Sequence, residues 1–271
     1  MKSIKVVIKK TEATMSDKDL SKAGGEKVGS FPFVVEPFSE DCAGFLSWRF
    51  MGNHLLRCAS LHAGANGFGY EQMIHENRAW VLSRLIVDLE EMPRTGQRYF
   101  INTWVNRIYR QFTDRMFSIT DGNGRVFGKA FSIWALIDIN SRRPVDLETL
   151  PDGGFSSAIV EDKVEVNLHP RVRVKMTEPV QTLTAHYSDL DINGHVNSIR
   201  YIEMLLDLFD TAFIKGNPLR HIEMAYSSES YSGDNLQLYR ASLCNGYFAA
   251  EIRKGGGEPV IKAVLGFREN H

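Results

Sequence analysis

The order of helix-type and strand-type segments most restricts the fold of this chain, because the same order occurs twice. In residues 29–146, short strand-type runs precede a helix-type segment at 53–65, and β-rich runs follow it. In residues 171–271, a strand-type run precedes a helix-type segment at 195–209, and β-rich runs again follow. One long helix followed by antiparallel strands predicts an α+β layer in which a curved sheet wraps around the helix. The chain is therefore predicted to contain two such units in tandem.

Hydrophobic spacing and turn residues locate the elements within each half. Apolar residues at intervals of three and four indicate one buried face of the second helix; they are Val196, Ile199, Ile202, Leu205, Leu206 and Phe209. The segments 121–124 (Asp-Gly-Asn-Gly) and 245–246 (Asn-Gly) predict hairpin turns. Gly52 and Gly194 precede the two helices, and we interpret them as corresponding positions. The strand-type runs are 31–35, 45–50, 80–89, 98–108, 113–120 and 125–138 in the first half, and 172–185, 221–227, 235–244, 247–253 and 259–268 in the second.

Shifts in composition suggest the domain boundaries. Residues 1–28 are rich in Lys, Ser, Asp and Gly and are predicted to form a flexible extension. Residues 147–170 contain Pro151, Gly153 and Gly154 and are predicted to link the unit 29–146 to the unit 171–271.

Charge and cysteine content exclude several classes of function. The net charge of the 271 residues is −1, which argues against a nucleic-acid or anionic-membrane binder. No segment has the apolar length needed to span a bilayer, and the lysine-rich start is too charged for a signal peptide. The three cysteines form no metal-binding or redox motif, so we expect free thiols in a reducing cytoplasm.

Residues 187–197 place two carboxylates, a histidine and two side-chain amides around one glycine, between a strand-type and a helix-type run. At the start of a helix, free amides and the helix dipole favour negative charge. This arrangement would suit polarisation of a carbonyl group and activation of water. Asp191 and Asn193 are equally residue types that cap helices, so the residues alone leave both interpretations open. Asp189 and Asn197 are expected to cap and brace the loop.

Several motifs in order resemble the acyl-ACP thioesterases, the double-hotdog enzymes related to the plant Fat proteins. The second half contributes Asp-Ile-Asn-Gly-His-Val-Asn at 191–197 and Tyr-Ile-Glu at 201–203. The first half contributes the segments 67–69, 80–82, 103–105, 132–138 and 141–144, which are similar to the N-terminal hotdog domain of that family. The resemblance covers roughly residues 30–270 and implies two tandem hotdog domains.

The resemblance implies cytoplasmic hydrolysis of fatty acyl-ACP thioesters without metal or cofactor, which ends fatty acid synthesis. The family's proposed catalytic residues correspond to Asp191, Asn193, His195 and Glu229. Plant members have a cysteine directly after the glutamate, whereas this chain has Ser230. A cysteine nucleophile is therefore excluded here, and we expect a water nucleophile. We assign its activation to Glu229, with Asp191 as the rival base.

The remaining site residues have supporting roles in this interpretation. Asn193 would position the carbonyl group or the water, and His195 would donate a hydrogen bond or relay a proton. Backbone N–H groups within 195–197 are expected to stabilise the oxyanion. His54, at the first helix, lacks the preceding Asp-x-Asn motif and is expected to be structural, so we predict one active site per chain. The first half would supply the acyl pocket, with side chains such as Leu55, Leu56 and Ala59.

Acyl carrier protein is the expected partner, and its acidity predicts a basic surface near the site. The candidate residues are Arg107, Arg110, Arg142, Arg143, Arg171, Arg173, Arg200 and Arg220. A homodimer is a further possibility. The alternative functions are an acyl-CoA thioesterase, a hotdog dehydratase that acts on 3-hydroxyacyl thioesters, and a non-enzymatic acyl-thioester sensor. No helix-turn-helix pattern occurs in residues 1–28 to support the sensor.

Overall fold

A computed structural model of the chain describes residues 26–150, 155–168 and 177–268. The described strands form one ten-stranded sheet in the order β1-β3-β4-β5-β2-β7-β10-β9-β8-β6, with antiparallel neighbours throughout. The strands are β1 Gly29–Val34, β2 Arg78–Leu89, β3 Arg98–Tyr109, β4 Phe112–Asp121, β5 Val126–Asp138, β6 Gln181–Thr184, β7 Leu219–Tyr226, β8 Asn235–Ser242, β9 Tyr247–Lys254 and β10 Pro259–Phe267.

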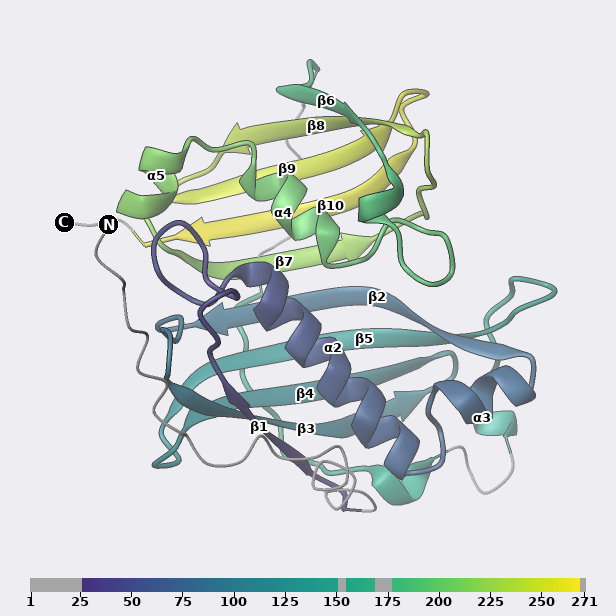
Figure 1. The fold of residues 1–271 in the computed structure, drawn as a ribbon. Helices are drawn as coiled ribbons and strands as arrows, with labels where there is room; N and C mark the ends of the chain where they lie inside the picture. The colour runs from purple at the N-terminus through teal and green to yellow at the C-terminus, as the bar shows by residue number, and fades with distance from the viewer. Residues whose placement is uncertain (1–25, 151–154, 169–176, 269–271) are drawn as a thin grey trace, which may run out of the picture.

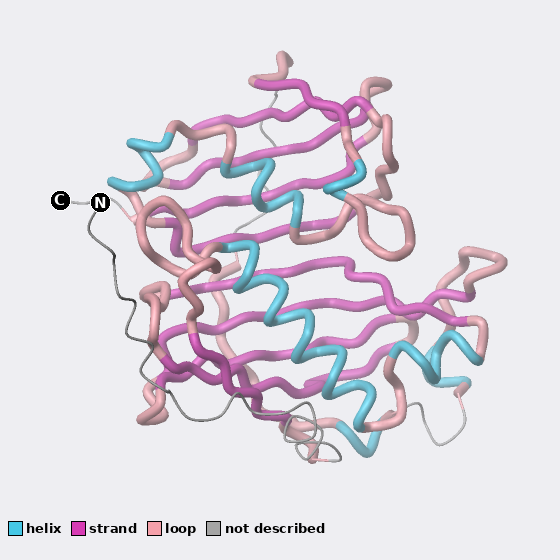
Figure 2. The backbone as a smooth tube through the Cα atoms, in the orientation of Figure 1, coloured by secondary structure: helices cyan, strands magenta, loops and turns pink. Residues whose placement is uncertain are grey.

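The helices lie on one face of this sheet (Figure 1). They are α2 Trp48–Ala65, α3 Tyr70–His75, α4 Arg200–Leu206 and α5 Thr211–Gly216, together with the short 3₁₀ helices η1 Leu147–Thr149, η3 Ser156–Ala158 and η4 Tyr187–Asp189. Helix α2 crosses the strands of the first half, and α4 crosses those of the second, as the tube view also shows (Figure 2). The predicted α+β architecture of two sheet-and-helix units is therefore confirmed.

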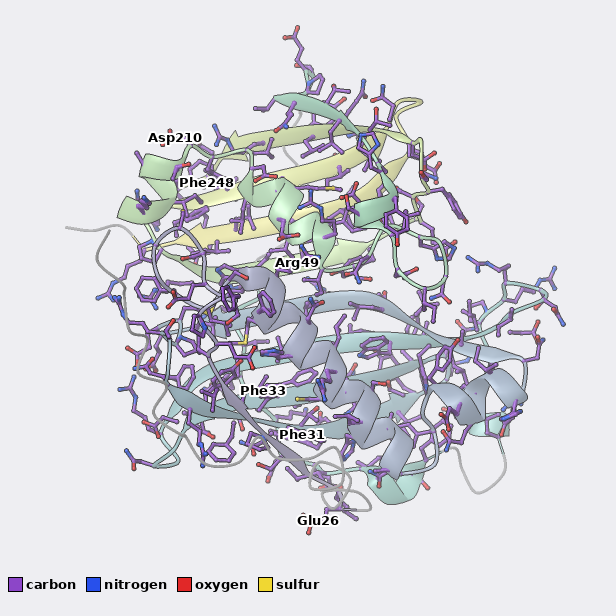
Figure 3. All side chains as sticks on the ribbon, viewed as in Figure 1. Glu26, Phe31, Phe33, Arg49, Asp210 and Phe248 are labelled. Carbon is purple, nitrogen blue, oxygen red and sulfur yellow. The ribbon has the colours of Figure 1, made fainter. Side chains whose placement is uncertain are left out.

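The two halves join where β2 pairs with β7. Arg84 on β2 forms an ion pair with Glu223 on β7, and Asp88 contacts His221 at 2.7 Å across the same seam. Above the seam, the start of α2 approaches α4, and the Arg49 guanidinium lies 3.7 Å from the carboxylate of Glu203 on α4 (Figure 3). One continuous hydrophobic core spans both halves, so the two units form a single packed body.

Helix α2 begins earlier than its sequence pattern predicts. The Ser47 side chain accepts a hydrogen bond from the N–H of Phe50 at 3.4 Å and so caps the helix at Trp48. The prediction of a strand at 45–50 is therefore wrong. Met51, Leu55 and Cys58 are fully buried on the face of α2 that packs in the core.

The second helix is shorter than predicted. Helix α4 covers only Arg200–Leu206, and His195 and Val196 instead form isolated β-bridges, to Tyr231 and Leu190 respectively. Val196 and Ile199 are still buried, which explains why a helical spacing of apolar residues extends into this loop. The polar cluster consequently lies on a loop before the helix, not on its first turn.

The hairpin predictions at 121–124 and 245–246 are confirmed by the β4–β5 and β8–β9 pairings. Of the strand-type run 172–185, residues 181–184 form β6, and residues 172–176 lie outside the described residues. Most of the predicted extension, residues 1–25, lies outside them too. The domain boundaries therefore stay predictions.

Candidate active site

The loop at 189–197 is closed by the carboxylate of Asp191. Its Oδ1 atom accepts the N–H groups of Asn193, at 2.8 Å, and of His195, at 3.1 Å. The N–H of Asp191 in turn donates to the carbonyl of His195 at 2.7 Å. Gly194 completes the turn with φ at +79°, a conformation that costs other residues roughly 1–2 kcal/mol.

This loop is fixed to the segment that follows β7. Val196 N–H donates to the carbonyl of Ser230 at 2.8 Å, and His195 forms a β-bridge with Tyr231. The pairing brings His195 to Glu229, which is distant in sequence, with 3.6 Å between Nδ1 of the histidine and Oε1 of the glutamate. The edge of the Tyr231 ring contacts the histidine ring, with centroids 5.0 Å apart.

Glu229 is held mainly through its other oxygen. Oε2 accepts hydrogen bonds from Nη2 of Arg142, at 2.5 Å, and from the Tyr231 hydroxyl, at 3.0 Å. Partial burial by itself would raise the pKa of Glu229, but these two hydrogen bonds and the nearby His195 outweigh it and hold the pKa below its ordinary value. Glu229 is therefore a carboxylate at neutral pH.

The other predicted residues have different surroundings. Asp191 uses one carboxylate oxygen to close the loop, whereas the Asn193 side chain is exposed and makes no hydrogen bond to another described residue. Asp189 accepts from the N–H of His186 and from Arg200, and Asn197 accepts from the N–H of Ile199. Asp189 and Asn197 thus brace the loop, as predicted.

The predicted oxyanion site at the backbone of 195–197 is wrong. The N–H of His195 binds Asp191, that of Val196 binds the Ser230 carbonyl, and that of Asn197 binds the Asp189 carbonyl at 2.8 Å. All three donors are occupied because the segment is a bridged loop and not the open first turn of a helix.

The first half contains the same loop with different side chains. Oδ1 of Asp41 accepts the N–H groups of Ala43, at 2.8 Å, and of Phe45, at 3.2 Å, and the Asp41 N–H donates to the Phe45 carbonyl at 2.7 Å. Gly44 has φ at +78°. The counterpart of Gly194 is therefore Gly44, and the prediction that Gly52 corresponds to Gly194 is wrong. An Asp-x-x-Gly sequence in both halves is the signal that could have revealed this match.

The segments that pack beside the two loops also correspond to each other. Leu46 N–H donates to the carbonyl of Pro93 at 2.8 Å, just as Val196 N–H donates to that of Ser230. Arg94 lies over the Phe45 ring at 4.0 Å, where Tyr231 contacts His195 in the second half. By this register, the first half has Ala43, Phe45 and Met92 in place of Asn193, His195 and Glu229.

In the first half, the places of His195 and Glu229 are therefore taken by Phe45 and Met92, whose side chains do not ionise. A cavity of about 490 Å³ lies there, lined by Asp41, Ala43, Phe45 and Met92 among others, but it holds no counterpart of the His195–Glu229 pair. His54 lies elsewhere, hydrogen-bonded to the Tyr99 hydroxyl at 2.5 Å. Burial and the nearby Arg57 lower the pKa of His54 to about 4, so it stays neutral, in agreement with its predicted structural role.

No group of His, Cys, Asp and Glu side chains within the described ranges is arranged to hold a metal ion. None of the helices found there is long and apolar enough to cross a bilayer. Leu55 and Ala59 are packed in the common core, and the predicted acyl pocket beside them stays a prediction.

Comparison of the sequence with known protein families and proteins identifies its relatives. Models of the acyl-ACP thioesterase N-terminal and C-terminal domains match residues 33–149 and 174–266. A chloroplastic acyl-(acyl-carrier-protein) hydrolase of Cuphea viscosissima is 28% identical over 189 residues, which are 66% of this chain and 45% of that protein. A palmitoyl-acyl carrier protein thioesterase of Arabidopsis thaliana is 26% identical over 201 residues, 70% of this chain and 49% of that protein. The chain thus spans about half the length of these plant relatives.

Solved structures agree over the whole fold. An acyl-ACP thioesterase from Bacteroides thetaiotaomicron has 41% sequence identity and a TM-score of 0.84, covering 94% of this chain and 100% of that one. The 12:0-ACP thioesterase from Umbellularia californica, at 20% identity, shares the fold with a TM-score of 0.79, covering 90% of this chain and 98% of that one. The predicted double-hotdog fold is confirmed, and the chain belongs to the acyl-ACP thioesterase family.

Proposed function

We propose that this protein hydrolyses the thioester between a fatty acyl chain and acyl carrier protein, and so ends fatty acid synthesis by releasing free fatty acid. The observation that carries the proposal is the His195–Glu229 pair, 3.6 Å apart in the second half and replaced by Phe45 and Met92 in the first. Membership of the acyl-ACP thioesterase family supports the choice of substrate.

In the proposed mechanism, Glu229 is the general base. A water molecule that bridges Nδ1 of His195 and Oε1 of Glu229 would lie beside a carboxylate that is already ionised. Glu229 takes a proton from this water while the water oxygen attacks the thioester carbon. The carbon–sulfur bond then breaks, and the proton ends on the departing sulfur. The products are a fatty acid and the free thiol of the carrier, and both side chains return to their initial states.

Asn193 and His195 are proposed to contact the substrate. The Asn193 side chain is exposed and has no partner among the described residues, so its amide N–H is available to the carbonyl oxygen that becomes negative. Nε2 of His195 makes no hydrogen bond in the described part of the chain either, and it would donate to the same oxygen or relay a proton.

Burial argues against a covalent mechanism through Ser230. Ser230 has a relative exposure of 0%, so its hydroxyl cannot reach a thioester that enters from solvent. Water therefore remains the nucleophile in our proposal, as expected from the sequence.

Acyl carrier protein is the proposed partner. Four of the basic candidates form ion pairs within the chain: Arg107 with Asp114, Arg110 with Asp146, Arg142 with Glu229, and Arg200 with Asp189. Arg171 and Arg173 lie outside the described residues, so the docking surface stays a prediction. The predicted homodimer stays a prediction as well.

The cytoplasm is the compartment that we propose for this reaction. Cys42, Cys58 and Cys244 are free thiols in the structure, which suits a reducing environment.

The decisive experiment compares kcat/KM for acyl-ACP and acyl-CoA of equal chain length, with the wild-type protein and two loop variants. His195→Phe and Glu229→Met copy residues that the first-half loop already carries, so both variants should fold and lose hydrolysis by roughly 10²–10⁴-fold. Phe45→Leu and Met92→Leu are the matched controls and should keep wild-type rates.

Each alternative function predicts a different result, from this comparison or from a companion assay. A clear preference for acyl-CoA would replace the proposal with an acyl-CoA thioesterase. Hydration of an enoyl thioester would indicate a dehydratase, and tight binding of acyl thioesters without turnover would indicate a sensor. Normal rates in both His195→Phe and Glu229→Met would show that the site is misassigned.

A further inference from the structure

We propose that Arg142, a residue of the first half, is a positioning residue for the reaction at Glu229 in the second half. The inference rests on the proposed function. The Arg142 guanidinium binds Oε2 of Glu229, and in the proposed mechanism it thereby orients the carboxylate so that Oε1 faces the bridging water and His195. The catalytic base would then depend on both halves of the duplicated fold.

The turn that carries Arg142 is well fixed. It follows β5, and Oδ1 of Asp138 accepts both the N–H and the hydroxyl of Ser141, at 2.7 and 2.8 Å. Asn77 donates to the second oxygen of Asp138 at 3.0 Å, and the Arg142 N–H donates to the Asp138 carbonyl at 2.9 Å. These bonds hold Arg142 at φ +58°, a strained conformation for a residue with a side chain. Such strain persists where the surrounding contacts over-determine it, often at functional sites.

The contacts of Glu229 are divided unequally between its two oxygens. Oε2 receives the Arg142 guanidinium and the Tyr231 hydroxyl, whereas His195 is the one polar partner recorded for Oε1 among the described residues. Within the described part of the chain, Arg142, Tyr231 and His195 are the titratable or charged groups that face this carboxylate. Because two donors fix Oε2, rotation of the carboxylate is restricted, and Oε1 keeps its place opposite Nδ1 of His195.

Arg142 is also one of the basic candidates for a docking surface for acyl carrier protein, and its side chain is 54% exposed. Docking and positioning predict different results with a small substrate. A docking residue acts only when the carrier protein is present, whereas a positioning residue acts on any thioester. An acyl-N-acetylcysteamine thioester carries no protein and therefore separates the two roles.

The test measures kcat, KM and pH profiles of wild type, Arg142→Met, Arg142→Lys and Arg143→Met with this thioester and with acyl-ACP. We expect Arg142→Met to lower kcat by about 10–100-fold on both substrates, with KM for the small thioester nearly unchanged. The acidic limb of its kcat profile should move to higher pH, because Glu229 loses one of the groups that lower its pKa. Arg142→Lys should recover part of the rate. Arg143→Met is the control and should match wild type on the small thioester.

A further variant distinguishes the loss of positioning from a folding defect. Arg142→Ala, assayed with and without low millimolar guanidinium, should recover activity when guanidinium fills the exposed site. Wild-type kcat of Arg142→Met on the small thioester, or a loss confined to acyl-ACP, would overturn the proposal. So would a rate loss without any shift of the acidic limb or any rescue by lysine or guanidinium. If the wild-type protein hydrolysed no thioester, the proposed function itself would fail.

Discussion

Asp191 and Glu229 are the two carboxylates that could activate water, and three matched variants separate their roles. In Asp191→Asn, the side-chain carbonyl can still accept the N–H groups of Asn193 and His195 that Asp191 accepts at 2.8 and 3.1 Å. Asp41→Asn makes the same change in the first-half loop, where Asp41 accepts bonds of 2.8 and 3.2 Å. Glu229→Gln removes the proposed base.

The expected losses of stability follow from the hydrogen bonds that each aspartate accepts. A bond to a charged group contributes about 1 kcal/mol more than a bond to a neutral one. With two such bonds on a partly exposed carboxylate, each aspartate variant should lose about 1–2 kcal/mol of unfolding free energy. Asp191→Asn should retain kcat within about tenfold, whereas Glu229→Gln should lower it by roughly 10²–10⁴-fold, as expected for a missing general base.

Two assays check this. Thiol release from an acyl thioester gives kcat, and urea unfolding gives the free energy of each variant. Equal losses of stability in Asp41→Asn and Asp191→Asn would show that the two loops use their aspartates alike. The reasoning is refuted if Asp191→Asn loses as much activity as Glu229→Gln while its stability matches that of Asp41→Asn.

Three further predictions concern the turns, the buried serine and the histidines. Gly44→Ala and Gly194→Ala should each lose about 1–2 kcal/mol in urea unfolding, because φ is +78° and +79°, and only Gly194→Ala should also lower kcat. Ser230→Ala should keep kcat within about threefold, since the residue is buried; a loss on the order of a thousandfold would instead indicate a serine nucleophile. Burial and neighbouring arginines lower the pKa of His54 and His62 from 6.5 to about 4. The unfolded chain therefore binds more protons, and unfolding free energy should decline as the pH falls from 6.5 towards 4; a flat urea-unfolding profile would contradict this.

Local sequence patterns were sufficient to predict much of the fold. The hairpin at 245–246 follows from Asn-Gly, because those residues adopt the positive φ angles, +56° and +71°, that a tight turn requires. The alternation of strand-type runs and turns likewise predicted two α+β units. The second helix was overestimated because Val196 and Ile199 are buried from a loop, and burial alone does not distinguish a loop from a helix.

The motif at 191–197 and the family resemblance supplied the candidate site residues Asp191, Asn193, His195 and Glu229. Their arrangement in space depends on contacts between distant segments of the chain. The bridge between His195 and Tyr231 places Glu229 beside the histidine, and the turn after β5 brings Arg142 to the same carboxylate. These contacts join residues far apart in sequence, and their distances depend on strand register and loop closure. No local pattern of side chains encodes that register, since it results from packing the two halves into one sheet.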